Sequence, residues 1–223
     1  MVLGAHGPII RRSVPGLKTV REILLDGILF TPLGAAWTEV VAGSGTSVQA
    51  AGYKETTTGT TTGSTSRLYT DVLNFPGTTF PVDFSKRILW GFTIRRVTSD
   101  AAIIARVQLK AATTEGALAA SGLGVRAANL TLTGESYRTS GAFTATIQTM
   151  TAGDAYNILV DHEPAVPRVR FYVNGVLQAT QSTTGNIPNA AIASVGMITS
   201  ILNGAGTANA FSQIGAPWIY QGL

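Results

Sequence analysis

The sequence predicts an all-β fold in which two antiparallel sheets pack face to face. From Trp37 onward, short runs of alternating apolar and polar residues are separated by clusters of Gly, Thr, Ser and Asn, as in half-buried strands joined by turns. Asn174-Gly175, a strong hairpin signal, lies between two such runs, and no interior segment has a convincing helical pattern. At 223 residues the pattern favours a jelly roll over a smaller immunoglobulin-like sandwich.

An N-terminal arm precedes the predicted sandwich. Glycines and prolines interrupt residues 1–16, so we expect residues 1–35 to form an extended arm and residues 36–223 to form the jelly-roll domain. Leu17 to Phe30 carries apolar residues at helical spacing, although the same segment could equally be a strand that enters the domain. Removing residues 1–30 is therefore expected to leave a folded domain.

The middle of the chain is predicted to form a series of strands. Residues 54–66, rich in Thr and Gly, are expected to form a mobile hairpin tip or an edge strand. Residues 88–97 place their bulky side chains on one face, and these are Ile88, Trp90, Phe92 and Ile94. Residues 102–111 repeat the pattern, with Arg106, Gln108 and Lys110 on the polar face. With the alternating residues 129–133, 142–149 and 155–161, the pattern indicates about eight to twelve strands in two sheets.

The most specific local signal is the hairpin over Arg168 to Thr180. Its two alternating runs flank Asn174-Gly175, a pair that accepts the positive φ values of a type I′ turn. Alternation directs Val169, Phe171 and Val173 toward the core. Arg168, Arg170 and Tyr172 then line the outer face, where we expect them to contact a protein partner, because Arg and Tyr are common at the centres of interfaces.

Charge is scarce and unevenly placed. Charged residues make up 13% of the chain, against about 25% in an average globular protein. The last Asp, Glu, Lys, Arg or His of the chain is Arg170, so residues 171–223 carry no charged side chain at neutral pH. Surface that faces bulk water normally carries mixed charge. We therefore expect this uncharged stretch to lie inside the sandwich or against neighbouring copies of the chain.

The net charge of +4 comes from the first 21 residues of the arm. Four basic residues, Arg11, Arg12, Lys18 and Arg21, precede the first acidic residue, and the remaining basic and acidic residues balance. These side chains are expected either to contact an acidic protein surface or phosphate, or to be solvated. No basic stripe with interleaved aromatic residues follows, so a specific nucleic-acid partner is not expected.

Composition also excludes several classes of protein. A chain without cysteine has no disulfide framework, no thiol catalysis and no Cys-ligated metal. No run of about 18 apolar residues occurs, so we expect no membrane span. The opening residues lack the long apolar region of a secretory signal.

The sequence has no recognisable catalytic constellation. Asp161 and Glu163 flank His162 at a spacing that could place two carboxylates on one face of a strand, as glycosidases require. Pro164 and Pro167 follow at once, so we expect a solvated turn instead.

Metal and cofactor sites are not expected either. Asp154, Asp161 and Glu163 offer at most a partial calcium site. His6 and His162 are isolated from each other, which disfavours zinc. Phosphate-binding loops and dinucleotide fingerprints are absent. We therefore predict that the protein is not an enzyme and holds no cofactor.

Carbohydrate binding stays open, because it needs only an exposed aromatic ring and a few polar partners. The candidate rings are Tyr53, Tyr137, Tyr172, Trp218 and Tyr220. Trp218 and Tyr220 share one face of the terminal strand, and we expect both to pack in the core. Tyr172, beside Arg168 and Arg170, is the best exposed cluster, and there a protein contact is favoured over a sugar.

Several segments of the chain recur together in one known superfamily. They are WTEVVAGSGTSV, LWGFTIRRV, IARVQLKA, YNILVDHE and VRFYVNGVLQATQSTTGNIP. From about Trp37 to Tyr220, they resemble the concanavalin-A-like lectin/glucanase superfamily, and the hairpin from Arg170 to Pro188 is similar to the versions found in bacteriophage virion proteins. The resemblance implies a jelly-roll fold. It does not decide the function, since the superfamily contains lectins, glycanases and purely structural domains.

The uncharged stretch, the basic arm and the lack of recognisable catalytic residues together suit a non-enzymatic subunit of a large assembly. The resemblance implies that this assembly is a virion, and we expect a capsid decoration or cement protein of a tailed bacteriophage. The arm would dock on the major capsid protein or another virion protein. The uncharged stretch would pack against further copies in a homo-oligomer, for example a trimer. The alternative is a lectin-like, carbohydrate-binding module of a tail fibre or host-adhesion protein.

Overall fold

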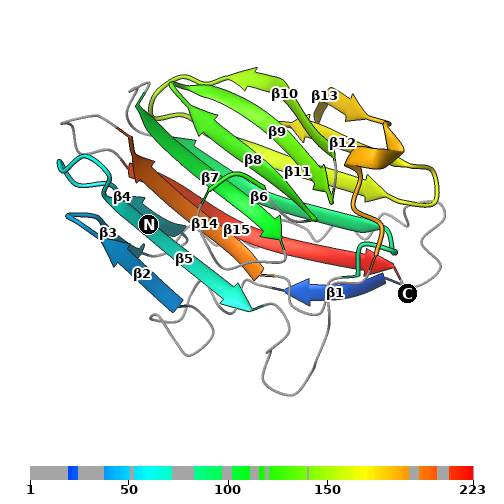
Figure 1. Ribbon diagram of the computed structural model, residues 1–223, viewed down its shortest axis with the longest axis horizontal. Helices are drawn as coiled ribbons and strands as arrows, with labels where there is room; N and C mark the ends of the chain where they lie inside the picture. The colour runs from blue at the N-terminus through cyan, green and yellow to red at the C-terminus, as the bar shows by residue number, and fades with distance from the viewer. Residues whose placement is uncertain are drawn as a thin grey trace, which may run out of the picture.

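The chain folds into two antiparallel sheets that pack face to face (Figure 1). A computed structural model describes residues 20–24, 38–50, 53–71, 83–96, 102–110, 116–118, 121–139, 141–190, 196–204 and 211–222. Helical structure in these residues is limited to one 3-10 turn, η1 (Thr184–Asn186). The predicted all-β antiparallel sandwich is thus confirmed. None of the described segments is a helix long and apolar enough to cross a bilayer.

Sheet A has eight strands. Seven follow the order β13–β12–β11–β6–β15–β4–β3, and β1 pairs with β15. In chain order they are β1 (Val20–Leu24), β3 (Thr46–Ala50), β4 (Tyr53–Thr57), β6 (Ile88–Arg96), β11 (Ala155–Glu163), β12 (Arg168–Val173), β13 (Val176–Gln181) and β15 (Phe211–Gly222).

Sheet B has seven strands in the order β10–β9–β8–β7–β14–β5–β2. In chain order they are β2 (Thr38–Ala42), β5 (Thr65–Asp71), β7 (Ile103–Lys110), β8 (Gly122–Ala128), β9 (Thr131–Arg138), β10 (Gly141–Thr149) and β14 (Gly196–Asn203). The described residues therefore hold fifteen strands, more than the pattern indicates, because residues 38–71 alone form four short ones.

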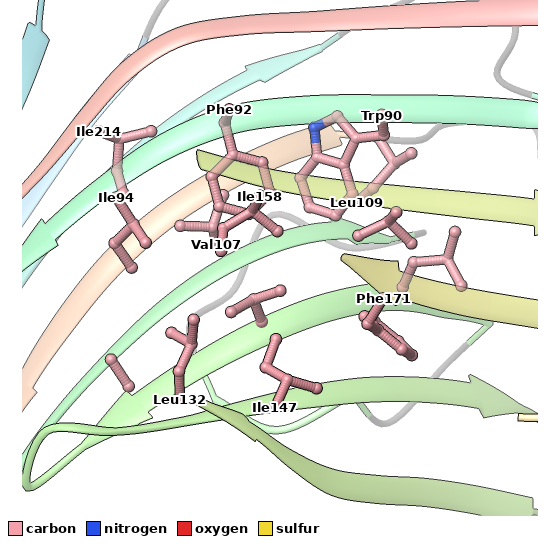
Figure 2. Packing of buried hydrophobic residues seen from close by; sticks show 14 of the residues in the cluster. Trp90, Phe92, Ile94, Val107, Leu109, Leu132, Ile147, Ile158, Phe171 and Ile214 are labelled. Carbon is pink, nitrogen blue, oxygen red and sulfur yellow. The ribbon is translucent and has the colours of Figure 1, made fainter. Parts of the chain in front are cut away.

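The core lies between the sheets and follows the alternation along the strands. Trp90, Phe92 and Ile94 of β6 point inward and meet Val107 and Leu109 of β7, with Phe171 of β12 nearby (Figure 2). Trp90 and Phe92 also contact each other, with ring centroids 4.9 Å apart. Burial of these large side chains is the main source of stability, at about 1.5–3 kcal/mol for each aliphatic or aromatic side chain.

The hairpin between β12 and β13 forms as predicted. Asn174 and Gly175 both adopt positive φ, at 50° and 82°, which suits the predicted type I′ turn. Val169, Phe171 and Val173 are buried, and the residues between them are half-buried on the outer face.

Residues 54–66 form neither a hairpin tip nor an edge strand, so that prediction is wrong. They contain parts of β4 and β5, which belong to different sheets and are each flanked by two strands. The connection between them crosses from sheet A to sheet B. Hydroxyl side chains of this connection and of the strand ends beside it are buried, namely Thr56, Thr58, Ser64 and Ser66. Gly63 donates its N–H to the carbonyl of Asn203 at 2.7 Å, which ties this crossing to β14.

Part of the predicted arm is hydrogen-bonded into the sandwich. Val20–Leu24 forms β1, which runs antiparallel to β15 from Val20 opposite Gly222 to Leu24 opposite Trp218. Figure 1 shows β1 beside the C-terminal part of β15, where β4 no longer covers that strand. Of the two structures that residues 17–30 could form, these five residues take the strand.

Candidate functional site

The outer face of sheet A carries a ladder of arginines and carboxylates on β11 and β12. Asp161 lies opposite Arg170, and Glu163 lies opposite Arg168. Arg168 Nε donates to Glu163 Oε2 at 2.8 Å, and Arg170 Nη2 donates to Asp161 Oδ2. Arg168, Arg170 and Tyr172 thus share the outer face, but the structure pairs both arginines with carboxylates of their own chain.

Asp161 and Glu163 do not lie in a solvated turn, which corrects the sequence prediction. β11 continues through Glu163, and the turn follows at residues 164–167. Asp161 is only 4% exposed. Both of its oxygens accept hydrogen bonds from Arg87, whose Nε and Nη2 lie 3.1 and 3.0 Å away. This hydrogen bond raises the pKa of Arg87. Both carboxylates of the ladder are thus paired with arginines of their own chain.

His162 points the other way, into the protein. Its Nε2 lies 2.6 Å from the carbonyl oxygen of Pro188, and its ring meets Phe84 edge to face. Burial lowers the pKa of His162, because a charged imidazolium is poorly solvated there. Within the described residues no group of three or more His, Cys, Asp or Glu side chains could hold a metal ion.

The sequence pattern predicts that Trp218 and Tyr220 pack in the core, and this prediction is wrong. Both side chains lie on the outer face of sheet A. Ile219, between them, is the buried residue of this stretch of β15. Trp218 lies over Gly91 of β6, where a Cβ would be 2.3 Å from the indole ring. The Trp218 and Tyr220 rings meet edge to face with centroids 5.1 Å apart. The missing side chain at Gly91 therefore seats this aromatic pair outside the core.

The outer face of sheet B carries a second group of polar side chains, which we call the sheet B cluster. Its members are Arg106, Gln108 and Lys110 of β7, Arg126 of β8, and Thr133 and Glu135 of β9. The strand register makes them neighbours: Arg106 lies opposite Arg126, which lies opposite Thr133. Alternation in β7 predicts its three members, but the contribution of β8 and β9 depends on register, which the sequence does not show.

The sheet B cluster is buried although it faces away from the core. Gln108, Lys110 and Glu135 are each less than 9% exposed. Gln108 Nε2 donates to the carbonyl of Gly116 at 3.0 Å, so Gly116 lies over this part of the sheet. On the edge strand β10, by contrast, Thr144 and Thr146 are exposed. The cluster is therefore covered over the middle of sheet B and approachable from the side of β10.

Several polar atoms of the sheet B cluster have no hydrogen-bond partner. They are Nε of Arg106, Oε1 of Gln108, Nε of Arg126 and Oε2 of Glu135. Arg126 Nε and Glu135 Oε1 form an ion pair at 3.4 Å. Buried polar groups in folded proteins are nearly always satisfied, so donors and acceptors left together in this way are typical of a site that receives a polar ligand or ordered water.

Glu135 is the carboxylate on which the positive charges of the sheet B cluster act. Burial raises its pKa, and the nearby charges of Arg106, Arg126 and Lys110 act in the opposite direction. Burial also lowers the pKa of Arg106. The side chains of Gln108 and Glu135 both lean toward Gly124, where a Cβ would lie 3.1 Å from Gln108 Cγ and 3.7 Å from Glu135 Oε2.

The remaining sequence candidates are dispersed. Arg11, Arg12 and Lys18 lie outside the described residues, and Arg21 is placed only through its backbone, opposite Gln221. Tyr53 is half-buried on β4. The ring of Tyr137 is half-buried on the outer face of sheet B, two residues after Glu135 on the same strand.

Comparison with known proteins reveals similarity at the level of fold. No known family model and no curated protein sequence matches the chain. Among solved structures, the carbohydrate recognition domain of Emp47p is similar, with a TM-score of 0.61 and 11% identity over 89% of this chain and 94% of that domain. A β-glucanase of Bacillus licheniformis matches with a TM-score of 0.58 and 12% identity, over 87% of this chain and 95% of the glucanase.

A sialidase also matches, with a TM-score of 0.57 and 10% identity over 90% of this chain. The chain spans only 18% of the length of that sialidase. These structures share the fold of this chain, so the jelly roll that the resemblance implies is confirmed. Identity this low shows a shared fold and leaves activity undecided, since the three include a recognition domain and two enzymes by name.

Proposed function

We propose that the protein is a lectin-like module that binds carbohydrate on the outer face of sheet B without cleaving it. The observation that carries the proposal is the sheet B cluster, in which unpartnered donors and acceptors stand side by side on three adjacent strands. The fold shared with the carbohydrate recognition domain of Emp47p supports the same function.

The chemistry of the cluster suits sugar hydroxyl groups. A hydroxyl can both donate and accept a hydrogen bond, and the unpartnered atoms include donors on Arg106 and Arg126 and acceptors on Gln108 and Glu135. Tyr137 adds an aromatic ring on the same face, two residues along β9 from Glu135. Ligand sites commonly combine such a ring with a few fixed polar groups.

The arrangement of carboxylates supports binding without hydrolysis. Glycosidases use two carboxyl groups that flank the scissile bond, whereas Glu135 is the single carboxylate of the sheet B cluster. On sheet A, Asp161 and Glu163 do share a face, but arginines occupy both of them. Both carboxylates are thus engaged by side chains of their own chain.

A glycan array that contains both neutral and acidic sugars, probed with the full chain, tests the proposal. We expect selective binding, and no reducing sugar or unsaturated product released from the bound glycan. Gly124→Val places a side chain in the middle of the cluster and should weaken binding by about tenfold or more, since every lost 1.4 kcal/mol is a factor of ten.

Gly185→Val is the matched control, because a Cβ at Gly185 meets nothing within 4 Å. Circular dichroism checks that both variants fold. An array without any selective signal would reject carbohydrate binding, and released product would reject the non-enzymatic role.

The virion role stays a prediction that rests on the sequence resemblance. The three structural relatives described above are named for carbohydrate recognition or for enzymes, and none of the three is named as a virion protein. Docking on a capsid protein and assembly into a homo-oligomer likewise stay predictions. A tail-fibre or adhesion module would agree with both the resemblance and the proposed sugar site.

A further inference from the structure

Two arginines of the sheet B cluster face each other directly across neighbouring strands. Arg106 of β7 lies opposite Arg126 of β8, and both side chains are on the outer face. Side chains in such a pair have Cβ atoms about 5 Å apart, and like charges at this distance are destabilising. Arg106 is 8% exposed, so water screens the repulsion weakly.

One carboxylate serves both guanidinium groups. Glu135 forms the 3.4 Å ion pair with Arg126, and its charge also acts on Arg106. Lys110 adds a third positive charge close enough to act on Glu135. The Nε atom of Arg106 nevertheless lacks a hydrogen-bond acceptor, and that of Arg126 faces Glu135 Oε1 at 3.4 Å without forming a hydrogen bond. Among the described residues of the cluster, two arginines therefore share one carboxylate, and the Nε of Arg106 has no acceptor.

We propose that the ligand of this site is an acidic glycan whose carboxylate or sulfate group is bound by Arg106 and Arg126. The inference rests on the proposed carbohydrate-binding function and narrows it to one class of sugar. An anion at this position would satisfy the unpartnered donors and separate the two like charges. Charge-assisted hydrogen bonds from arginine to such groups are stronger than neutral ones.

Arg126 is the point of contact with solvent. Its side chain is 35% exposed, whereas that of Glu135 beside it is 8% exposed. Thr133, its partner on β9, lies opposite the exposed Thr146 of β10. An acidic sugar can therefore reach Arg126 from the edge of the sheet before its charged group contacts the more buried Arg106.

The test compares three matched oligosaccharides with the full chain by calorimetry: an oligoglucuronate, its carboxyl-reduced neutral form, and a sulfated derivative of that neutral form. We expect the oligoglucuronate, the sulfated form or both to bind at least tenfold more tightly than the neutral form, and the two acidic arms distinguish carboxylate from sulfate. Arg126→Gln should weaken acidic binding by roughly tenfold.

Arg168→Gln is the control, because its side chain is also 35% exposed but lies on sheet A. It should leave binding unchanged. Equal binding of the neutral and acidic forms would overturn the acidic specificity while leaving the proposed function intact. Acidic binding that is lost in Arg168→Gln and kept in Arg126→Gln would overturn the placement on sheet B. If neither these sugars nor any glycan of the array binds, the proposed function itself fails.

Discussion

At the residue scale, His162 shows how a polar side chain is accommodated beside the core. It lies on β11 between the outward-facing Asp161 and Glu163, and strand alternation turns it inward. There it contacts the ring of Phe84, and its Nε2 pairs with the carbonyl of Pro188. The imidazole thus links β11 to the segment that follows η1.

The lowered pKa of His162 predicts a loss of stability in mild acid. The unfolded chain takes up a proton near pH 6.5, whereas the folded chain resists it. The contribution of His162 to the free energy of unfolding should therefore be fully present above pH 6.5. Below that value the free energy of unfolding should fall by up to about 1.4 kcal/mol per pH unit. Thermal unfolding of wild type and His162→Gln at pH 7.5, 6.5 and 5.5 measures this.

The comparison with His162→Gln isolates the histidine from other groups. Glu135 has a raised pKa, so its protonation stabilises the folded state as the pH falls, with the opposite sign. That contribution is present in both proteins. Equal slopes of stability against pH in wild type and variant would show that His162 is not responsible.

At the element scale, β1 shows that a short strand can close a gap in a sheet. β15 has twelve residues, and β4 pairs with its first part, from Phe211 to Gly215. β1 pairs with the remainder, from Trp218 to Gly222. Without β1, the backbone groups of this second half would form an open sheet edge beside Trp218 and Tyr220.

Truncation tests the contribution of β1. We expect removal of residues 1–30 to lower the free energy of unfolding by about 2–4 kcal/mol, because a five-residue strand loses several hydrogen bonds worth about 1 kcal/mol each. Removal of residues 1–19 leaves β1 in place and is the control. Urea titration of both truncated chains measures the difference, and equal midpoints would contradict the role of β1.

At the scale of the whole molecule, the position of the last two strands accounts for much of the uncharged stretch. β14 lies between β7 and β5 in sheet B, and β15 lies between β6 and β4 in sheet A. Ile201 and Ile219, one from each strand, are fully buried. The stretch is exposed at the β12–β13 hairpin, where Val176 and Leu177 are 60% and 48% exposed. Burial inside the sandwich, one of the two explanations offered by the sequence, thus applies to both central strands.

A lysine scan of the uncharged stretch distinguishes its buried and exposed parts. Ile219→Lys buries an unpaired charge between the sheets and should cost several kcal/mol, enough to unfold a marginally stable domain. Gln178→Lys adds the same charge at an exposed position of β13 and should change stability by less than about 0.5 kcal/mol. Circular dichroism with thermal unfolding measures both, and a well-folded Ile219→Lys would contradict the burial of β15.

Local sequence patterns predict most strands of this fold. They fail where pairing with a strand distant in the sequence sets the length of a strand or the direction of a side chain. Alternation places Trp90, Phe92 and Phe171 in the core, and Asn174-Gly175 forms the predicted turn. Pro164 misleads, because pairing with β12 keeps β11 extended through Glu163. The alternation of Trp218 and Tyr220 is correct, but which face points outward depends on Gly91 of the neighbouring strand.

By itself, the sequence determined the fold class, the hairpin and the periodicity that divides each strand into an inner and an outer face, because these depend on residues near one another in the chain. Only the tertiary structure decided that Arg106, Arg126 and Glu135 meet on one face. It also decided that Asp161 is bound by Arg87, 74 positions away. Register between strands and cover by distant segments create these contacts, and neither is encoded in local sequence periodicity.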